Sequence, residues 1–121
     1  MLLFLTIPLS SGQVSARVWN DPSVITEHAV LEVKPGRESE FEGAFAEAKT
    51  IIASMPGFES LGLHRCTERP NCYLLLVEWA TLEDHTEGFR GSPEYHEWRR
   101  LLHHFYEPFP TVEHFSLAAR A

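Results

Sequence analysis

Four segments of the chain carry patterns that are typical of β-strands. In the first, the apolar residues Ala29, Leu31 and Val33 occupy alternate positions, and Pro35-Gly36 ends the run. The third contains the apolar run YLLLVEW, which is typical of a central strand that is buried on both faces. The predicted strands run from Val24 to Val33, from Phe58 to Cys66, from Cys72 to Trp79 and from Thr111 to Leu117.

One long helix is predicted between the first two strands, from Glu38 to Met55. Apolar side chains recur there at steps of four and three, which places them on a single stripe of a helix. Pro56-Gly57 then ends the helix. The stripe consists of Phe41, Phe45, Ala48, Ile52 and Met55.

A first short helix is predicted at the start of the stretch from Thr81 to Pro110, which is rich in aromatic and imidazole side chains. Thr81 and Asp84 have the spacing of a capping box, in which a hydroxyl and a carboxylate accept hydrogen bonds from backbone N–H groups. Gly88 and Gly91 follow, and glycine disfavours the continuation of a helix. We therefore expect a break between this helix and the next.

A second short helix restarts at Ser92-Pro93, because serine is a favoured N-cap and proline is pre-set for the first helical position. Its large apolar residues fall on one face, which must cover other apolar surface. These residues are Tyr95, Trp98, Leu102 and Phe105.

The order of these elements, β-α-β-β-α-α-β, is a split βαβ unit that occurs twice. It predicts an α+β, ferredoxin-like fold, in which the helices cover one face of a four-stranded antiparallel sheet. The other face is then bare, although the third strand is apolar on both sides. Because soluble monomers rarely expose so large an apolar patch, we expect a second copy of the sheet to cover it in a homodimer.

With 121 residues and 44% apolar content, the chain fits a single domain. We assign residues 24–118 to this domain and residues 1–23 to an N-terminal extension, which we expect to be poorly ordered. The apolar start of the extension, Met1 to Leu9, lacks the basic segment and cleavage motif of a secretory signal and is too short to span a bilayer. We therefore expect a cytoplasmic protein.

The net charge of −7 argues against nucleic acid and anionic membranes as partners, because both require a basic patch. Cys66 and Cys72 flank the turn between the second and third strands. An antiparallel hairpin could bring these two side chains face to face, but without a secretion signal we expect reduced thiols.

The sequence resembles the antibiotic biosynthesis monooxygenase family of dimeric α/β barrels, and within it a branch known mainly as uncharacterised bacterial proteins. The family includes cofactor-free oxygenases of aromatic polyketides and quinols, haem-degrading enzymes and members with no shown activity, so the fold alone selects no reaction. The resemblance covers about residues 24–118. It is carried by ITEHAVLEVKPG, the helix that ends in SMPGF, YLLLVEW and HTEGFRGSPEYHEWRRLLHHFY.

The resemblance does not extend to the haem ligands of the family. The haem-degrading branch has a histidine ligand about two turns after the serine that starts the second helix, and an asparagine on the first strand. Here Arg99 stands at the place of that histidine, and no asparagine occurs from Ile25 to Val33. A protein-bound metal is also not expected, because His103 and His104 point in different directions on a helix. We therefore expect no cofactor.

A cofactor-free oxygenase needs an apolar pocket for an electron-rich phenol, a base for its proton and a donor that stabilises the resulting anion. We predict this site between the sheet and residues 81–109, with Arg90 holding the anion. His28 and His114 lie on strands that should be neighbours, so we expect their rings at the same end of the pocket. The candidate bases are His28, His85 and His114, and the candidate wall residues are Trp79, Phe89, Tyr95, Trp98 and Phe105.

Each candidate residue also has a purely structural explanation. Trp98 and Phe105 fit the core between helix and sheet. His85 fits a hydrogen bond to a backbone carbonyl, and Arg90 fits an ion pair with a nearby acid. Two functions therefore stay open: a monooxygenase of a small hydrophobic aromatic or quinol substrate, and a non-catalytic dimer that binds a small apolar ligand or acts as a stress-related accessory protein.

Overall fold

The computed structural model describes residues 23–121 and contains the predicted order of elements, so the ferredoxin-like α+β fold is confirmed. The predicted extension, residues 1–23, lies outside the described residues except for Ser23. The strands are β1 (Ile25–Glu32), β2 (Phe58–Arg65), β3 (Cys72–Trp79) and β4 (Val112–Ser116). The helical elements are α2 (Glu38–Ile52), the π-helical η2 (Asp84–Phe89), α3 (Pro93–Leu102) and the 3-10 turn η3 (His103–Phe105).

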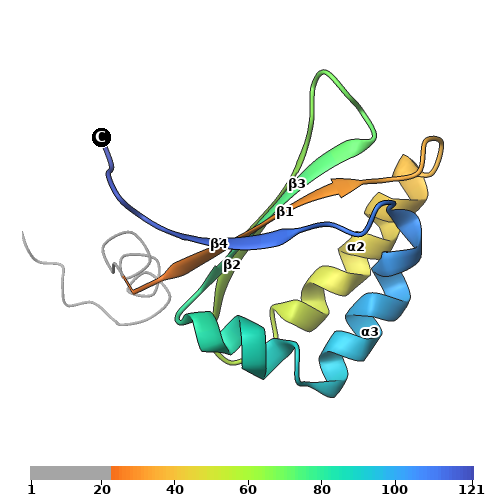
Figure 1. Ribbon diagram of the computed structural model, residues 1–121. Helices are drawn as coiled ribbons and strands as arrows, with labels where there is room; N and C mark the ends of the chain where they lie inside the picture. Colours follow the sequence, from red (N-terminus) through yellow and green to blue (C-terminus); the bar gives the residue numbers. More distant parts are fainter. Residues whose placement is uncertain (1–22) are drawn as a thin grey trace, which may run out of the picture.

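The first strand lies inside the sheet, between the third and the fourth. The strand order is β2-β3-β1-β4, and all neighbouring strands are antiparallel (Figure 1). This register places Glu27 of β1 between Val77 of β3 and His114 of β4. Side chains from both neighbouring strands therefore lie beside Glu27.

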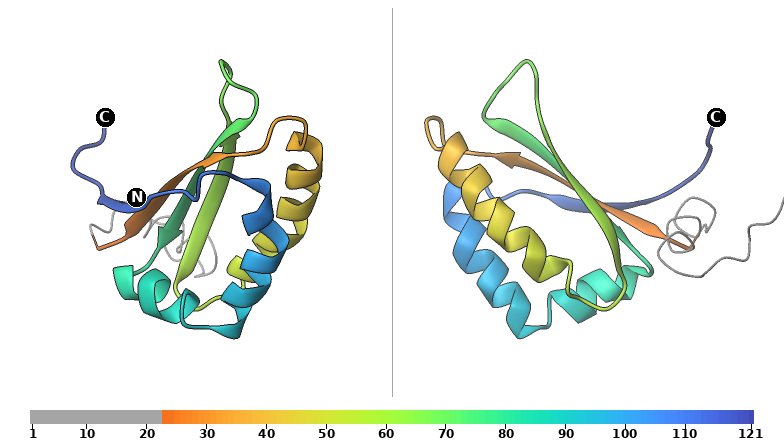
Figure 2. Two further views of the ribbon diagram at one scale, coloured as in Figure 1. Left: turned by 45° about the vertical axis from the view of Figure 1, so that its right-hand side comes forward. Right: turned by 180° about the vertical axis from the view of Figure 1, so that it is seen from behind.

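The helices all lie against one face of the sheet (Figures 1 and 2). Apolar side chains from the helices and from the inward positions of the strands fill the space between the two layers. Among the most deeply buried are Phe41, Ile52, Val77, Trp79 and Leu102. None of the helices within residues 23–121 has the length and apolar character that crossing a membrane requires.

The predicted helix starts are confirmed. The backbone N–H groups of Thr81 and Asp84 each donate to the other residue's side chain, at 3.1 Å in both cases. At the start of α3, the hydroxyl of Ser92 accepts from the N–H of Tyr95 at 3.2 Å, and Pro93 takes the first helical position. These hydrogen bonds fix where η2 and α3 begin, and thus how their side chains face the sheet.

The opposite face of the sheet carries apolar side chains that the other described residues, 23–121, leave exposed. Val30, Phe115 and Leu117 are 38%, 50% and 52% exposed. Leu74 and Leu76 of β3 point to the same face and are half-buried. Within residues 23–121, the central strand is therefore fully buried on its helix-covered face and mostly half-buried on the other.

Candidate active site

The candidate site is built around an acidic side chain at an inward position of β1. Glu27, Ala29 and Leu31 occupy alternate positions and all point to the helix-covered face. Glu27 is only 6% exposed. A carboxyl group buried so deeply needs polar partners, because an unpaired polar group in an apolar environment is unfavourable.

Two ring side chains supply these partners. The indole Nε1–H of Trp79, on β3, donates to Oε1 of Glu27 at 3.0 Å. His85, in η2, places its Nε2 at 3.3 Å from the same oxygen. Burial raises the pKa of Glu27, while the Trp79 N–H and the charge of Arg90 act in the opposite direction. Glu27 therefore keeps its proton to a higher pH than an exposed glutamate does.

His85 is held through its ring face and through both of its nitrogens. The ring stacks on Trp79, with the centroids 5.5 Å apart and the planes inclined by 21°. Its Nδ1 lies 2.8 Å from Nε2 of His114, so one ring donates a hydrogen bond to the other. Burial, followed by the charges of Arg90 and His114, lowers the pKa of His85 to about 3. His85 is therefore a neutral imidazole at pH 7.

Arg90 directly follows η2 and is exposed. Its positive charge acts to lower the pKa of Glu27, of His85 and of His114. The guanidinium is therefore close enough to influence all three titratable groups. An anion that forms beside these groups would be stabilised by the same charge.

A small cavity of about 30 Å³ adjoins Glu27 and His85 on the helix-covered side of the sheet. This volume suffices for one or two water molecules and is far below the roughly 300 Å³ at which pockets for small ligands begin. Phe89, Tyr95 and Trp98 form part of its wall. The cavity is thus small and lined by several aromatic rings, and Glu27 and His85 are among the titratable groups that bound it.

His103, Tyr106 and Phe109 line the cavity from the chain segment that follows α3. The rings of His103 and Phe109 meet edge to face at 4.9 Å between centroids, and Phe109 is 63% exposed. Burial and the charge of Arg99 lower the pKa of His103 to about 4, and burial raises the pKa of Tyr106. Phe109 therefore belongs both to the cavity wall and to the molecular surface.

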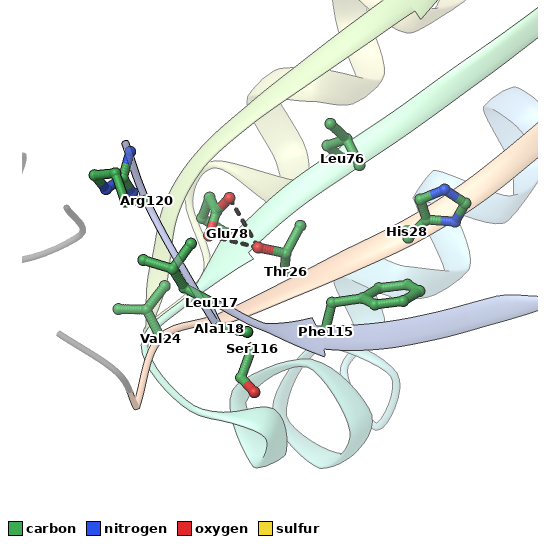
Figure 3. A pocket seen from close by; sticks show the side chains of 10 residues that line it. All are labelled: Val24, Thr26, His28, Leu76, Glu78, Phe115, Ser116, Leu117, Ala118 and Arg120. Carbon is green, nitrogen blue, oxygen red and sulfur yellow. Dashed lines mark hydrogen bonds between the residues drawn. The ribbon is translucent and has the colours of Figure 1, made fainter. Parts of the chain in front are cut away.

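His28 does not join this cluster, which corrects the expectation that it shares a pocket with His114. In the register of β1 and β4, His114 lies opposite Glu27, whereas His28 lies opposite Glu113. Successive residues of a strand point to opposite faces, so His28 points away from the helices. There its ring packs against that of Phe115, with the ring centroids 5.3 Å apart. His28 lines an open hollow of about 480 Å³ on the bare face (Figure 3).

The predicted wall residues divide into three groups. Phe89, Tyr95 and Trp98 line the cavity. Trp79 does not line it, but holds Glu27 and His85 from behind. Phe105 is buried in the core between the helices and the sheet, as its structural explanation predicts. Trp98 belongs to that core as well as to the cavity wall.

Among the cavity residues that were not predicted from the sequence are Glu27, His103, Tyr106 and Phe109. The sequence did contain a signal for Glu27. This residue stands two positions before Ala29, so its side chain shares the buried face of the strand with Ala29, and an acidic residue is unusual on such a face. The other three follow the end of α3. No periodicity applies there, and only tertiary packing brings these side chains to the cavity.

Potential metal ligands are scattered over the described part of the chain. Within residues 23–121, no group of three or more histidine, cysteine, aspartate or glutamate side chains is arranged to hold a metal ion. Cys66 and Cys72 are both free thiols.

Comparison with known proteins shows relatives along most of the chain. The sequence model of the antibiotic biosynthesis monooxygenase family matches residues 24–101. YczJ of Bacillus subtilis, an uncharacterised protein, is 60% identical over 93 residues, which cover 77% of this chain and 98% of YczJ.

Solved structures share the fold. A candidate antibiotic biosynthesis monooxygenase of Bordetella bronchiseptica is 35% identical with a TM-score of 0.77, over 80% of this chain and 99% of that protein. SnoaB of Streptomyces nogalater, a cofactor-independent oxygenase, is 24% identical with a TM-score of 0.65, over 82% of this chain and 95% of SnoaB. The similarity to SnoaB shows a common fold.

Proposed function

We propose a function from the premise that this chain belongs to the antibiotic biosynthesis monooxygenase family. The proposed function of the protein is that of a cofactor-independent monooxygenase, which acts on a small hydrophobic aromatic or quinol substrate. The observation that carries this proposal is the buried pair of Glu27 and His85 at the wall of the cavity. Oε1 of Glu27 and Nε2 of His85 lie 3.3 Å apart. The oxygenase SnoaB, which shares the fold, supports the reaction type.

In the proposed reaction, the substrate itself reduces oxygen. A base removes a proton from an activated carbon, and the carbanion transfers electrons to O2 and forms a carbon–oxygen bond with it. The peroxide takes up a proton and then loses water. For an anthrone, the CH2 group becomes a C=O group: one oxygen atom enters the product and the other leaves as water.

The residues of the site fit the steps of this reaction. The buried titratable pair, Glu27 and His85, supplies the base. Arg90 stabilises the carbanion and the peroxide, since its charge already acts on both members of that pair. The rings of Phe89 and Tyr95 offer apolar surface to an aromatic substrate.

The cavity has to open before a substrate binds, because about 30 Å³ does not hold an aromatic ring. Phe109 is the least restrained part of its wall, since it is 63% exposed. Gly88 lies within η2 and Gly91 lies two positions after its end, and the two offer a second place where the backbone can change conformation. Binding is therefore coupled to a movement of the segment around Phe109 or of η2.

Oxygen consumption by metal-free protein in the presence of anthrones and hydroquinones tests the proposal. We expect the wild type to consume oxygen, and His85→Ala and Arg90→Ala to lower kcat by about 100-fold or more. His96→Ala, at an exposed position of α3, is the matched control and should retain the wild-type rate. A wild type that consumes no oxygen with any of these phenols contradicts the proposed function.

Non-catalytic binding of a small apolar ligand is the second candidate function. The dense packing of the aromatic rings of Phe89, Tyr95 and Trp98 around the cavity supports it. It predicts saturable binding of a hydroquinone without oxygen consumption, so the oxygen measurement distinguishes the two functions when binding is measured in parallel.

We also propose that the protein works as a homodimer, in which the bare faces of two sheets pack together. The exposed apolar side chains of Val30, Phe115 and Leu117 support this assembly. A cytoplasmic location is proposed as well. The free thiols of Cys66 and Cys72 support it, because disulfides are rare in that compartment.

A further inference from the structure

We propose that Glu27, His85 and His114 form a proton relay between the cavity and the edge of the sheet, and that Glu27 is the group that exchanges protons with the substrate. This inference rests on the proposed function, because the proton that the relay carries is the one removed from the substrate. It assigns the acid–base chemistry to Glu27 and makes the two histidines positioning residues behind it.

Both ring nitrogens of His85 already face protein groups. Its Nδ1 shares the hydrogen bond with Nε2 of His114 at 2.8 Å, and its Nε2 lies 3.3 Å from Oε1 of Glu27. A substrate proton reaches neither nitrogen unless one of these partners moves away. His85 is therefore poorly placed to act directly as the base.

Glu27 is better placed, because it lines the cavity and has two carboxyl oxygens. Its contacts with Trp79 and His85 both use Oε1. Oε2 is then the oxygen that can exchange a proton with a bound substrate. The distance from Oε1 to His85 needs to shorten by only a few tenths of an ångström to reach the usual length of a hydrogen bond.

A proton can cross the relay without placing a charge on His85. Glu27 takes the substrate proton and becomes a neutral carboxyl group. The carboxyl group then turns so that its protonated oxygen faces Nε2 of His85 and gives that nitrogen the proton, while Nδ1 of His85 gives its own proton to Nε2 of His114. Glu27 is again a carboxylate, His85 is neutral with its proton on the other nitrogen, and His114 is an imidazolium that releases a proton to solvent. The reverse sequence returns a proton to the peroxide.

His114 is suited to be the outer end of the relay. It lies on the edge strand β4 and is half-buried, whereas His85 and Glu27 are 2% and 6% exposed. Glu27 and His114 are also partners in the register of β1 and β4. The sheet backbone therefore holds both ends of the relay in place, and η2 inserts His85 between them.

The charge of Arg90 acts on the protonation states of all three relay residues. Arg90 acts to keep Glu27 ionised and to keep His85 and His114 neutral. Burial, followed by the charges of Tyr95 and Glu27, raises the pKa of Tyr106. Burial, followed by the charge of Arg90, lowers the pKa of His114 and thus favours release of a proton from its ring to solvent.

Imidazole nitrogen NMR tests the relay without any substrate. In protein with 15N-labelled histidine, we expect His85 to show one protonated and one unprotonated nitrogen from pH 5 to pH 8. We also expect a 15N–15N coupling across the hydrogen bond from His85 Nδ1 to His114 Nε2. His114→Gln should shift the His85 nitrogens, whereas His96→Gln should not. A doubly protonated His85, or the absence of the coupling, overturns the relay.

Kinetics test the assignment of roles. Glu27→Gln keeps an oxygen that accepts from Trp79, and should lower kcat about 100-fold or more while KM changes little. His114→Ala should lower kcat less, and added imidazole should restore part of the lost rate because it replaces the missing outer group. A merely structural role of His114 would show no such rescue.

The outcomes separate the relay from the proposed function. A wild type without turnover contradicts the proposed function, and the nitrogen spectra then decide on the relay alone. A wild type that turns over a phenol, and whose rate is unchanged by Glu27→Gln or by His114→Ala, overturns the relay and leaves the proposed function standing.

Discussion

At the scale of single residues, the cavity wall depends on buried polar groups that satisfy one another. Glu27, Trp79 and His85 come from three different elements, and removal of one leaves another without its partner. A buried donor or acceptor that loses its partner costs about 1–3 kcal/mol. The contacts that set the proton affinity of the site therefore also contribute to stability, and pH should affect both.

The free energy of unfolding should fall when the pH is lowered from 7 to 5. Folded His85 has a pKa of about 3, whereas an unfolded histidine titrates near 6.5, so the unfolded chain binds more protons between these values. Stability from His85 is thus complete above pH 6.5 and is lost as the pH falls, by about 1–2 kcal/mol at pH 5. His103, with a pKa of about 4, acts in the same direction, and Glu27, with its raised pKa, acts in the opposite one.

Urea unfolding of wild type and variants at pH 7 and pH 5 measures this effect. His85→Gln should show a smaller fall in stability between the two values than the wild type does. His96→Gln, at an exposed position, should show the same fall as the wild type. Equal falls in the wild type and in His85→Gln would contradict the assignment.

Trp98→Ala should destabilise the fold by about 3–5 kcal/mol, because it removes a large buried ring from the core. Trp98 is 6% exposed and packs on Phe45 and Phe89, with centroids 5.8 Å and 5.7 Å away. Phe109→Ala is the control, since that ring is 63% exposed, and it should cost less than about 1 kcal/mol. Comparable losses in the two variants, measured by urea unfolding, would mean that Trp98 is not a core residue.

At the scale of the elements, the position of η2 depends on the turn that leads from α2 to β2. Gly57 has a φ of +84°, and a Cβ atom there would lie 2.1 Å from the side chain of Asp84. Asp84 is the first residue of η2 and forms the capping box with Thr81. This turn therefore controls how closely η2, and with it His85, approaches the sheet.

Substitution of two glycines by alanine should have opposite effects on stability. Gly57→Ala should destabilise by more than about 1 kcal/mol, since it adds both backbone strain and a steric clash. Gly43→Ala should stabilise by about 0.5–1 kcal/mol, because Gly43 lies inside α2 with nothing within 4 Å of an added Cβ. Thermal unfolding of the two variants checks the prediction, and a stabilising Gly57→Ala would contradict the account of the turn.

The elements were predictable from the sequence because each is specified locally. The strand Cys72–Trp79 starts and ends where its apolar run does, and Ser92-Pro93 starts α3 as expected. The end of α2 differs: the helix stops at Ile52, and the N–H groups of Ser54 and Met55 bond to carbonyls three residues earlier. Apolar periodicity persists through such a tightened last turn and does not reveal it.

The candidate site was only partly predictable, because its geometry depends on register. His28 and His114 were both expected at the pocket, and a one-residue difference in phase places them on opposite faces of the sheet. The approach of Glu27, His85 and His114 requires the pairing of β1 with β4 and the docking of η2. No local pattern in the sequence specifies that combination.

At the scale of the whole molecule, the helices cover only one face of the sheet. The opposite face carries exposed apolar side chains and an open hollow, and His28 is one of the residues that line the hollow (Figure 3). Two copies that bury this face against each other would complete the core of β3 on both sides. The cavity beside Glu27 and His85 lies on the helix-covered face, so the proposed dimer leaves it within each subunit.

Disruption of the proposed dimer should depend on which face carries a new charge. Val30 and Leu82 are equally exposed, at 38%, but only Val30 lies on the bare face of the sheet. Val30→Asp should convert a dimer into a 13.8 kDa monomer, or prevent folding, because it would bury a charge in the interface. Leu82→Asp should leave the dimer intact. Sedimentation of a wild-type monomer at micromolar concentration would contradict the homodimer.

The proposed function requires that the protein insert one atom of molecular oxygen into an aromatic substrate without a cofactor. Reaction of metal-free protein with an anthrone under 18O2, followed by mass spectrometry of the quinone, tests it most directly. We predict that one 18O atom enters the new carbonyl group, that one anthrone is consumed per O2, and that Glu27→Gln abolishes this incorporation. Quinone without 18O, or hydrogen peroxide formed in place of water, would contradict the claim.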